Sequence, residues 1–115
     1  MEVEVAFTGV PVSDLTRGQD FFERLLGKPP DVLVNENEVM WHVAEAAWLY
    51  VVVDPARAGR ALAAVSVPDL DAALGELASR GIVDFVIEQP GPTARKATFL
   101  DPDGNSVAVI EVREN

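Results

Sequence analysis

The feature that most constrains this chain is an internal repeat. The string VPVSDL occupies residues 10–15, and the similar string VSVPDL occupies residues 65–70. Each string combines strand-like valine alternation with an aspartate that suits the N-cap of a helix. The same order of predicted elements follows each string. The sequence therefore predicts two copies of one supersecondary unit.

The first copy is predicted as a strand, a helix and three further strands. β-branched residues dominate residues 3–12, and apolar residues at helical spacing follow Asp14 as far as Leu26. Gly27 suits the position just after a helix C-terminus. Three apolar runs complete the unit, at residues 32–34, 39–43 and 47–53.

The second copy follows a linker at residues 54–59, which is rich in turn-forming residues. It is predicted as a strand at 60–67, a helix between Asp69 and Gly81, and strands at 82–88, 95–100 and 106–112. The last two strands flank the string DPDGN, whose proline and glycine favour a tight turn. We predict one domain over residues 1–115, with repeat unit one at about 3–53 and unit two at about 60–113.

Composition excludes several classes of function. A net charge of −10 argues against nucleic-acid binding, which requires Lys and Arg to neutralise phosphates. The charge favours solubility, and it also suits a cationic ligand. The chain has no cysteine, so disulfides and thiolate metal sites are excluded. We expect no membrane span, because no run of about 18 apolar residues occurs. The acidic N-terminus carries no signal-peptide pattern, and we expect a cytoplasmic protein.

The doubled βαβββ order, the two VxVxDL strings and the closing DPDGN hairpin resemble the glyoxalase/bleomycin resistance/dioxygenase superfamily, also called the vicinal oxygen chelate proteins. The resemblance covers about residues 3–113. It implies an α+β fold in which two βαβββ repeats form curved mixed sheets, with helices on the convex face and a cavity on the concave face. The fold by itself does not define a function.

Alternation along the predicted strands separates two kinds of face. In the strand at 47–53, Val51 and Val53 share one face and oppose Trp48 and Tyr50. In the strands at 60–67 and 106–112, valines likewise oppose Leu62 or small residues. We expect the valine face to pack against helices and the other face to line a pocket.

The resemblance also implies where metal-dependent members hold their ligands. The corresponding positions here are Phe7, Tyr50, Leu62 and Ala108. Phe, Leu and Ala offer no ligand atom, and Tyr is a rare ligand. We therefore predict no metal and no cofactor. A lone His42 does not make a four-ligand site, and we interpret it as a hydrogen-bonded strand residue or a polar group of the pocket.

Charged side chains provide further candidates. Glu88 and Arg95 flank a loop at 89–92, where they either border a cavity mouth or are solvated. We expect Glu111 in solvent, because a buried lone carboxylate is costly. No catalytic residue is assigned. The cavity candidates are Phe7, Trp41, His42, Trp48, Tyr50, Leu62, Glu88, Arg95, Phe99 and Ala108.

The leading functional hypothesis is a metal-free small-molecule binding protein that resembles the bleomycin-resistance branch and sequesters a hydrophobic or cationic aromatic compound. We expect a homodimer, because each half-sheet leaves an open edge, and the repeats can pair within one chain or swap between two. The alternative is a metal-independent enzyme of the lyase or isomerase type, with His42, Tyr50 or Glu88 as acid–base groups. A third hypothesis is an interaction module whose own side chains fill the pocket. We expect no nucleic-acid or membrane partner, and leave open whether the protein is an enzyme.

Overall fold

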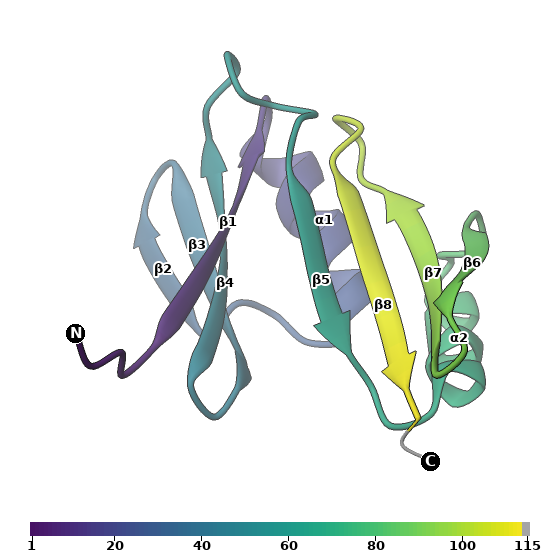
Figure 1. Ribbon diagram of the computed structural model, residues 1–115. Helices are drawn as coiled ribbons and strands as arrows, with labels where there is room; N and C mark the ends of the chain where they lie inside the picture. The colour runs from purple at the N-terminus through teal and green to yellow at the C-terminus, as the bar shows by residue number, and fades with distance from the viewer. Residues whose placement is uncertain (114–115) are drawn as a thin grey trace.

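The computed structural model describes residues 1–113 and shows two four-stranded sheets with two helices (Figure 1). The strand order is β1-β4-β3-β2 in the first sheet and β5-β8-β7-β6 in the second. The elements are β1 (Ala6–Val12), α1 (Leu15–Leu26), β2 (Val32–Asn35), β3 (Glu38–Ala44), β4 (Ala47–Val53), β5 (Leu62–Ser66), α2 (Leu70–Ser79), β6 (Val86–Gly91), β7 (Ala94–Leu100) and β8 (Ser106–Val112).

Both sheets are mixed, because each contains one parallel pairing. β1 runs parallel to β4, and β5 runs parallel to β8, whereas the other pairs are antiparallel. The order βαβββ occurs twice along the chain, which confirms the predicted fold class. Neither helix in the described part of the chain has the length and apolar character that a membrane span requires.

The helices begin where the sequence predicts. The Asp14 side chain accepts the Arg17 N–H at 3.0 Å, and the Asp69 side chain accepts the Ala72 N–H at 3.1 Å. Both aspartates have extended backbone, as N-cap residues do. Gly27 ends α1 with φ of 78°, a conformation that favours glycine, and its N–H bonds the Glu23 carbonyl.

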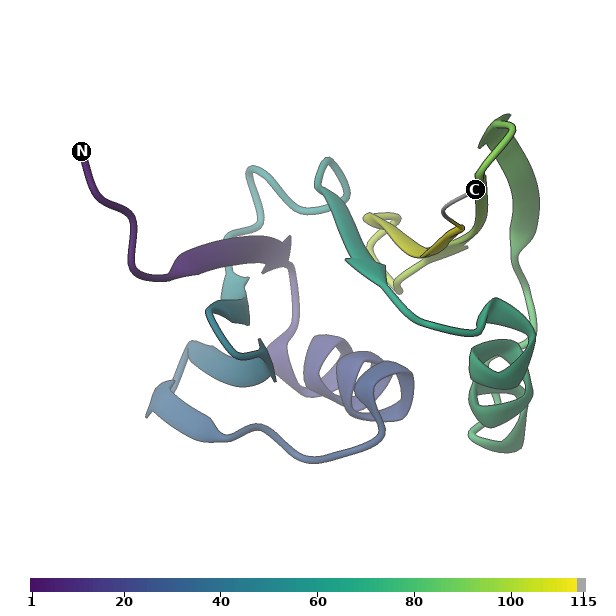
Figure 2. The same cartoon turned by 60° about the horizontal axis from the view of Figure 1, so that its bottom comes forward.

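Both helices cover the same side of the molecule (Figure 2). α1 packs on β3 and β4, and α2 packs on β7 and β8. The sheet residues beneath them alternate with exposed or half-buried neighbours, as the valine pattern predicts. We call the other side of each sheet its open face, because no helix covers it. The fully buried valines are Val10, Val12, Val51 and Val107.

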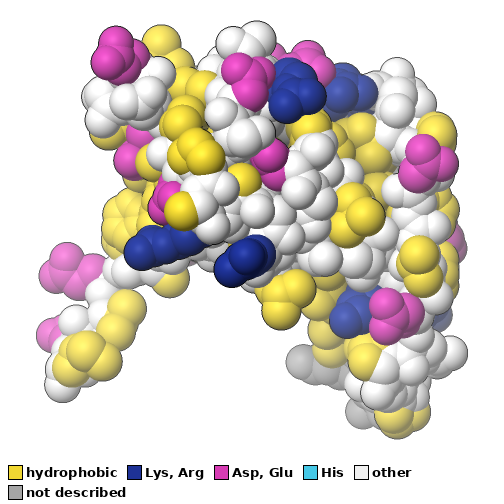
Figure 3. Space-filling model, turned by 90° about the horizontal axis from the view of Figure 1, so that it is seen from above, with side chains coloured by type: hydrophobic (Ala, Val, Ile, Leu, Met, Phe, Trp, Pro, Cys, Tyr) yellow, Lys and Arg dark blue, Asp and Glu magenta, His cyan; other side chains and the backbone are white. Residues whose placement is uncertain are grey.

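Two predicted strand boundaries are wrong. β1 begins at Ala6, because β4 begins at Ala47 and offers no partner to residues 1–5. Those residues extend away from the body (Figure 3). β6 begins at Val86 and continues through the segment predicted as a loop. Ile82 instead belongs to the C-terminal turn of α2, since its N–H bonds the Leu77 carbonyl and its side chain is buried.

The DPDGN turn joins the two halves of the chain. Asn105 is fully buried, and its Oδ1 accepts the Gly59 and Ala61 N–H groups at 3.0 and 2.9 Å. Its Nδ2 donates to the Pro11 carbonyl in the first half at 2.8 Å. In the same turn, Asp103 accepts hydrogen bonds from the Ser13 N–H and hydroxyl. The turn therefore links the second repeat to both the linker and the first repeat.

Arg80 links the halves a second time. Its Nε donates to the Arg24 carbonyl, and its Nη2 donates to the Leu25 carbonyl at 3.3 Å. Both carbonyls belong to the last turn of α1, where helix carbonyls lack partners within the helix. A cation there also complements the negative end of the helix dipole.

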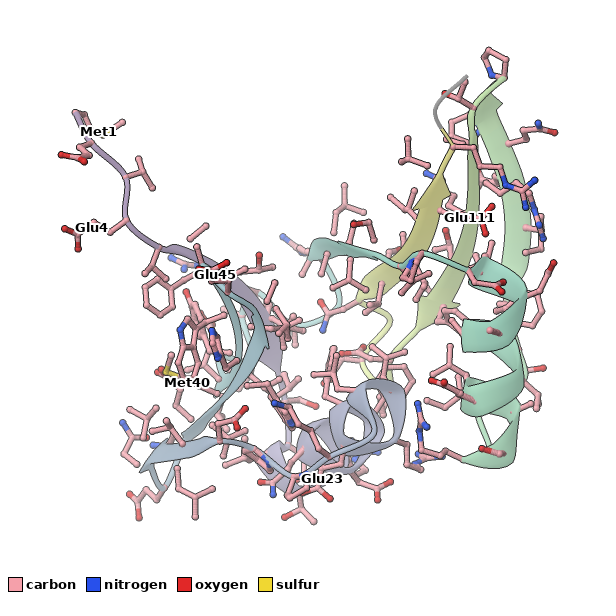
Figure 4. The ribbon with its side chains drawn as sticks, turned by 90° about the horizontal axis from the view of Figure 1, so that it is seen from below. Met1, Glu4, Glu23, Met40, Glu45 and Glu111 are labelled. Atoms are coloured by element: carbon pink, nitrogen blue, oxygen red, sulfur yellow. The ribbon has the colours of Figure 1, made fainter. Side chains whose placement is uncertain are left out.

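Glu111 is buried, so the prediction that it is solvated is wrong. Its carboxylate accepts the Leu70 N–H at the first residue of α2 and the Arg113 Nε–H, at 2.9 and 2.5 Å (Figure 4). These two hydrogen bonds hold the pKa of Glu111 below its usual value of 4.5. The free N–H groups of a helix start thus compensate the burial of this charge.

We predict that Asn105→Ala lowers the free energy of unfolding by about 3 kcal/mol, because it leaves buried N–H and carbonyl groups unpaired. Urea unfolding monitored by circular dichroism measures the change. Asn37→Ala, at an exposed turn residue, is the control and should stay within about 0.5 kcal/mol of the parent. Equal losses for the two variants would contradict the assigned role.

A second prediction concerns pH. Because folding lowers the Glu111 pKa, the ionised group adds stability above its usual value of 4.5, and this contribution disappears as pH falls through the lower folded value. The parent should therefore unfold at a higher urea concentration than Glu111→Gln. This difference should be largest near neutral pH and decrease in acid. Glu36→Gln, at an exposed turn, should show no such trend. A difference that stays constant down to strong acid would contradict this assignment.

Candidate functional site

An aromatic row crosses the open face of the first sheet. Phe7 on β1 is in register with Trp48 on β4, which is in register with His42 on β3. The His42 and Trp48 rings stack with centroids 4.7 Å apart and planes inclined by 24°. Phe7 remains 58% exposed. Three strands thus present adjacent rings on a face that no helix covers.

The next row contains one aromatic ring held over a glycine. Gly9, Tyr50, Met40 and Val32 are successive register partners across β1, β4, β3 and β2. The far end of the Tyr50 ring lies directly over Gly9, because a Cβ built there would be 2.5 Å from both Cζ and Oη of Tyr50. Figure 4 shows Met40 on the side of this sheet away from α1.

The open face of the second sheet has a different chemistry. Leu62 on β5, 86% exposed, begins a row that continues through Ser106 to Leu100. Ala108 is the register partner of Thr98 in the next row. Beyond it, Lys96 pairs with Glu88, so Glu88 lies on this open face. Aliphatic and hydroxyl groups with one pair of charges therefore replace the aromatic rings.

Three predicted cavity residues lie on the helix-covered side instead. Trp41 is fully buried against Phe22, and its Nε1 donates to the Lys28 carbonyl at 3.0 Å. Phe99 is 1% exposed. Arg95 ion-pairs with Asp71 of α2 at 3.1 Å. The prediction that these three side chains line the cavity is therefore corrected. Each lies an even number of residues from a buried residue on its own strand, so it points to the helix-covered face.

The structure adds residues that the candidate list omitted. They lie on the same sheet faces as Tyr50 or Ala108. The alternation of side chains along each strand could have identified them. The additional open-face residues are Gly9, Met40, Lys96, Thr98, Leu100 and Ile110.

Two carboxylates beside the sheets are held in ion pairs, Asp31 just before β2 and Asp71 on α2. The Asp31 carboxylate accepts the His42 N–H at 2.7 Å and the Lys28 ammonium at 2.9 Å, and these bonds lower its pKa. The hydrogen bond from Arg95 likewise lowers the pKa of Asp71. The His42 Nε2 lies 3.1 Å from the Glu45 carbonyl.

Two adjoining cavities lie between the halves of the chain. Their volumes are about 250 and 220 Å³, and they share Val43, Val65 and Ser66. The second extends between α1 and α2, where Leu26 and Leu77 line it. Trp48 of the aromatic row lines the first cavity. Neither cavity includes Phe7, His42, Tyr50 or Leu62, so the rest of the row is open surface in one chain.

The four positions that resemble metal-ligand sites all lie on open faces. Phe7 and Tyr50 belong to the first sheet, and Leu62 and Ala108 belong to the second. Only the tyrosine carries a polar side-chain atom. Within residues 1–113 no group of three or more His, Cys, Asp or Glu side chains could hold a metal. These side chains do not fit the ligand set of the metal-dependent members.

Comparison with known protein families assigns the chain to one superfamily. The model of the Glyoxalase/Bleomycin resistance protein/Dioxygenase superfamily matches residues 4–109. The chain belongs to this superfamily. No curated protein matched it.

Solved structures of this superfamily have the same fold. A glyoxalase/bleomycin resistance protein from Catenulispora acidiphila DSM 44928 is 37% identical with a TM-score of 0.88, over 94% of this chain and 97% of that one. TnmS3, an antibiotic binding protein from Streptomyces sp. CB03234, is 26% identical with a TM-score of 0.70, over 94% of each chain. The bleomycin resistance determinant of transposon Tn5 is 20% identical with a TM-score of 0.74, over 95% of this chain and 98% of that one, and shows the fold alone.

The opposite placement of the two tryptophans is testable by fluorescence. In Trp41→Phe, the remaining Trp48 is half-buried on the open face, so we expect red-shifted emission and strong quenching by acrylamide. In Trp48→Phe, the remaining Trp41 is fully buried and should resist the quencher. Equal quenching of the two variants as folded monomers would contradict the assignment of the faces.

Proposed function

We propose that this protein is a metal-free binding protein for planar hydrophobic or cationic aromatic compounds and acts as a homodimer. The observation that carries the proposal is the row of Phe7, Trp48 and His42 on an uncovered sheet face. Aromatic rings attract flat apolar molecules by stacking and cations through their π faces. The net charge of −10 favours the approach of cations.

The comparisons support a small-molecule binding role. Bleomycin-resistance-like proteins are among the structural neighbours, and one neighbour, TnmS3, is an antibiotic binding protein. The ligand-position side chains support metal independence, because Phe7, Leu62 and Ala108 provide no donor atom. Binding therefore rests on stacking and apolar contact.

The exposure of both open faces supports a homodimer. Phe7 is 58% exposed and Leu62, its counterpart in the second repeat, is 86% exposed. Leu100 on the same face as Leu62 is 64% exposed. Apolar surface of this kind gains free energy when covered, and a two-fold partner covers equivalent faces in both copies. A second copy would convert the aromatic row from an open surface into a wall of an enclosed site.

The positions of the candidate acid–base groups favour a binding protein over an enzyme. His42 is stacked on Trp48 and lies against the Glu45 carbonyl, so its ring has a structural position. Glu88 lies on the second sheet opposite Lys96, apart from the aromatic row of the first. His42, Tyr50 and Glu88 form no hydrogen-bonded acid–base pair with one another within residues 1–113.

Thermal unfolding of the metal-stripped protein tests the proposal. The protein is heated alone, with divalent metals, with the planar cation 9-aminoacridine, and with bleomycin, a larger cationic compound that carries an aromatic bithiazole. A compound that binds only the native state adds about 2.7 kcal/mol at a hundredfold excess over its Kd. We expect stabilisation by an aromatic probe and none by metals. Reproducible stabilisation by a divalent metal would overturn metal independence. Sedimentation equilibrium, run in parallel, should give a dimer.

Trp48→Ala should weaken binding of the stabilising probe about tenfold, because one stacking partner is lost. Trp48→Phe keeps a ring and should retain most of the affinity. Leu33→Ala removes an exposed apolar side chain that shares parity with buried Val39, and should leave binding unchanged. Isothermal titration calorimetry measures all three. Equal affinities for parent and Trp48→Ala would count against the aromatic row as the site.

A further inference from the structure

Gly9 leaves space for the Tyr50 ring, and its own backbone conformation does not call for a glycine. It is absent from the glycines with positive φ, so an alanine could adopt its backbone angles. The added Cβ, however, would lie 2.5 Å from Cζ and Oη of Tyr50 and 2.8 Å from Cε2. Side-chain atoms do not approach so closely, and the phenol would have to move. The missing side chain at Gly9 thus permits the observed position of the Tyr50 hydroxyl.

That position is above β1, on the open face. Tyr50 originates on β4, and its ring reaches across the neighbouring strand to Gly9. On this face, Tyr50 has two kinds of neighbour. Met40 is its register partner on β3, and the aromatic row that contains Trp48 is the next row of the sheet. The hydroxyl is therefore a polar group amid aromatic and aliphatic side chains.

The hydroxyl has no protein partner in the described part of the chain. Side-chain hydrogen bonds of this sheet region come from Lys28, Trp41 and His42, and none reaches Tyr50. An exposed hydroxyl is satisfied by water. Once a ligand covers the face, an unpaired hydroxyl costs free energy, and a ligand group that accepts its hydrogen bond removes the cost.

We propose that the Tyr50 hydroxyl is the hydrogen-bonding anchor of the ligand site, with Gly9 as its positioning residue, and that the preferred ligands are planar aromatic compounds with a carbonyl oxygen on the ring edge. This rests on the proposed function, since it assumes a flat ligand on the same face. A neutral carbonyl suits the site better than an anionic oxygen, because the chain carries a net charge of −10. Sites built to pair a polar group discriminate strongly against analogues that lack it.

The test uses 9-fluorenone and fluorene, which differ by a carbonyl in place of a methylene on one edge. Affinities are measured by quenching of tryptophan fluorescence. Tyr50→Phe keeps the ring and removes the oxygen, so fluorenone binding should weaken about fivefold while fluorene binding stays unchanged. Gly9→Ala displaces the phenol and should also lower the ratio of fluorenone to fluorene affinity. Gly75→Ala, a glycine with open space around its Cβ position, is the matched control.

The carbonyl stretch of bound fluorenone gives a readout that a purely structural role would not change. It should shift to lower frequency on the parent protein and lose that shift on Tyr50→Phe. If Gly9→Ala fails to fold, Tyr50→Phe and the carbonyl stretch still decide. Equal loss of both compounds in Tyr50→Phe, or an unchanged stretch, would overturn the anchor and leave the proposed function standing. Failure of every planar probe to bind the parent would overturn both.

Discussion

The fold depends on one buried amide. Asn105 uses its oxygen to hold the linker at Gly59 and Ala61, and its nitrogen to hold Pro11 of the first repeat. Two other groups of hydrogen bonds join the repeats, from Ser13 to Asp103 and from Arg80 to the last turn of α1. Because buried amides cost free energy unless fully paired, this residue fixes a single relative placement of the two sheets. The aromatic row and its counterpart on the second sheet keep their positions through that joint.

The two repeats share a scaffold and differ in what they display. Under the helices, both sheets pack valines, as at Val51 and Val107. On the open faces, the first sheet carries rings and the second carries Leu62, Ala108 and hydroxyl groups. A duplicated unit therefore supplies one face suited to stacking and another suited to close aliphatic contact. In the proposed dimer, these unlike faces would suit a flat ligand with an apolar body.

Much of this could be predicted from the sequence, because the relevant signals are local. The caps at Asp14 and Asp69 and the valine alternation depend on neighbouring residues only. The candidate site was less predictable. Residue type alone suggests that Trp41 belongs with the other aromatic side chains of the pocket. It lies two residues after Val39 on β3, however, so its side chain points to the same face, beneath α1. Glu111 was misplaced because the helix start that compensates its charge is 41 residues away in the chain.

The long sequence separation between Asn105 and its partner in the first repeat has a consequence for synthesis. Its partner Pro11 lies 94 residues earlier in the chain, and Ser13 lies 90 residues before its partner Asp103. The first repeat therefore leaves the ribosome well before the groups that lock it against the second exist. Until then its sheet has only contacts within the first repeat, and the aromatic row is uncovered. Contacts so distant in sequence form late, and an unfinished chain exposes apolar strands that favour aggregation. The turn at residues 101–105 thus completes the domain.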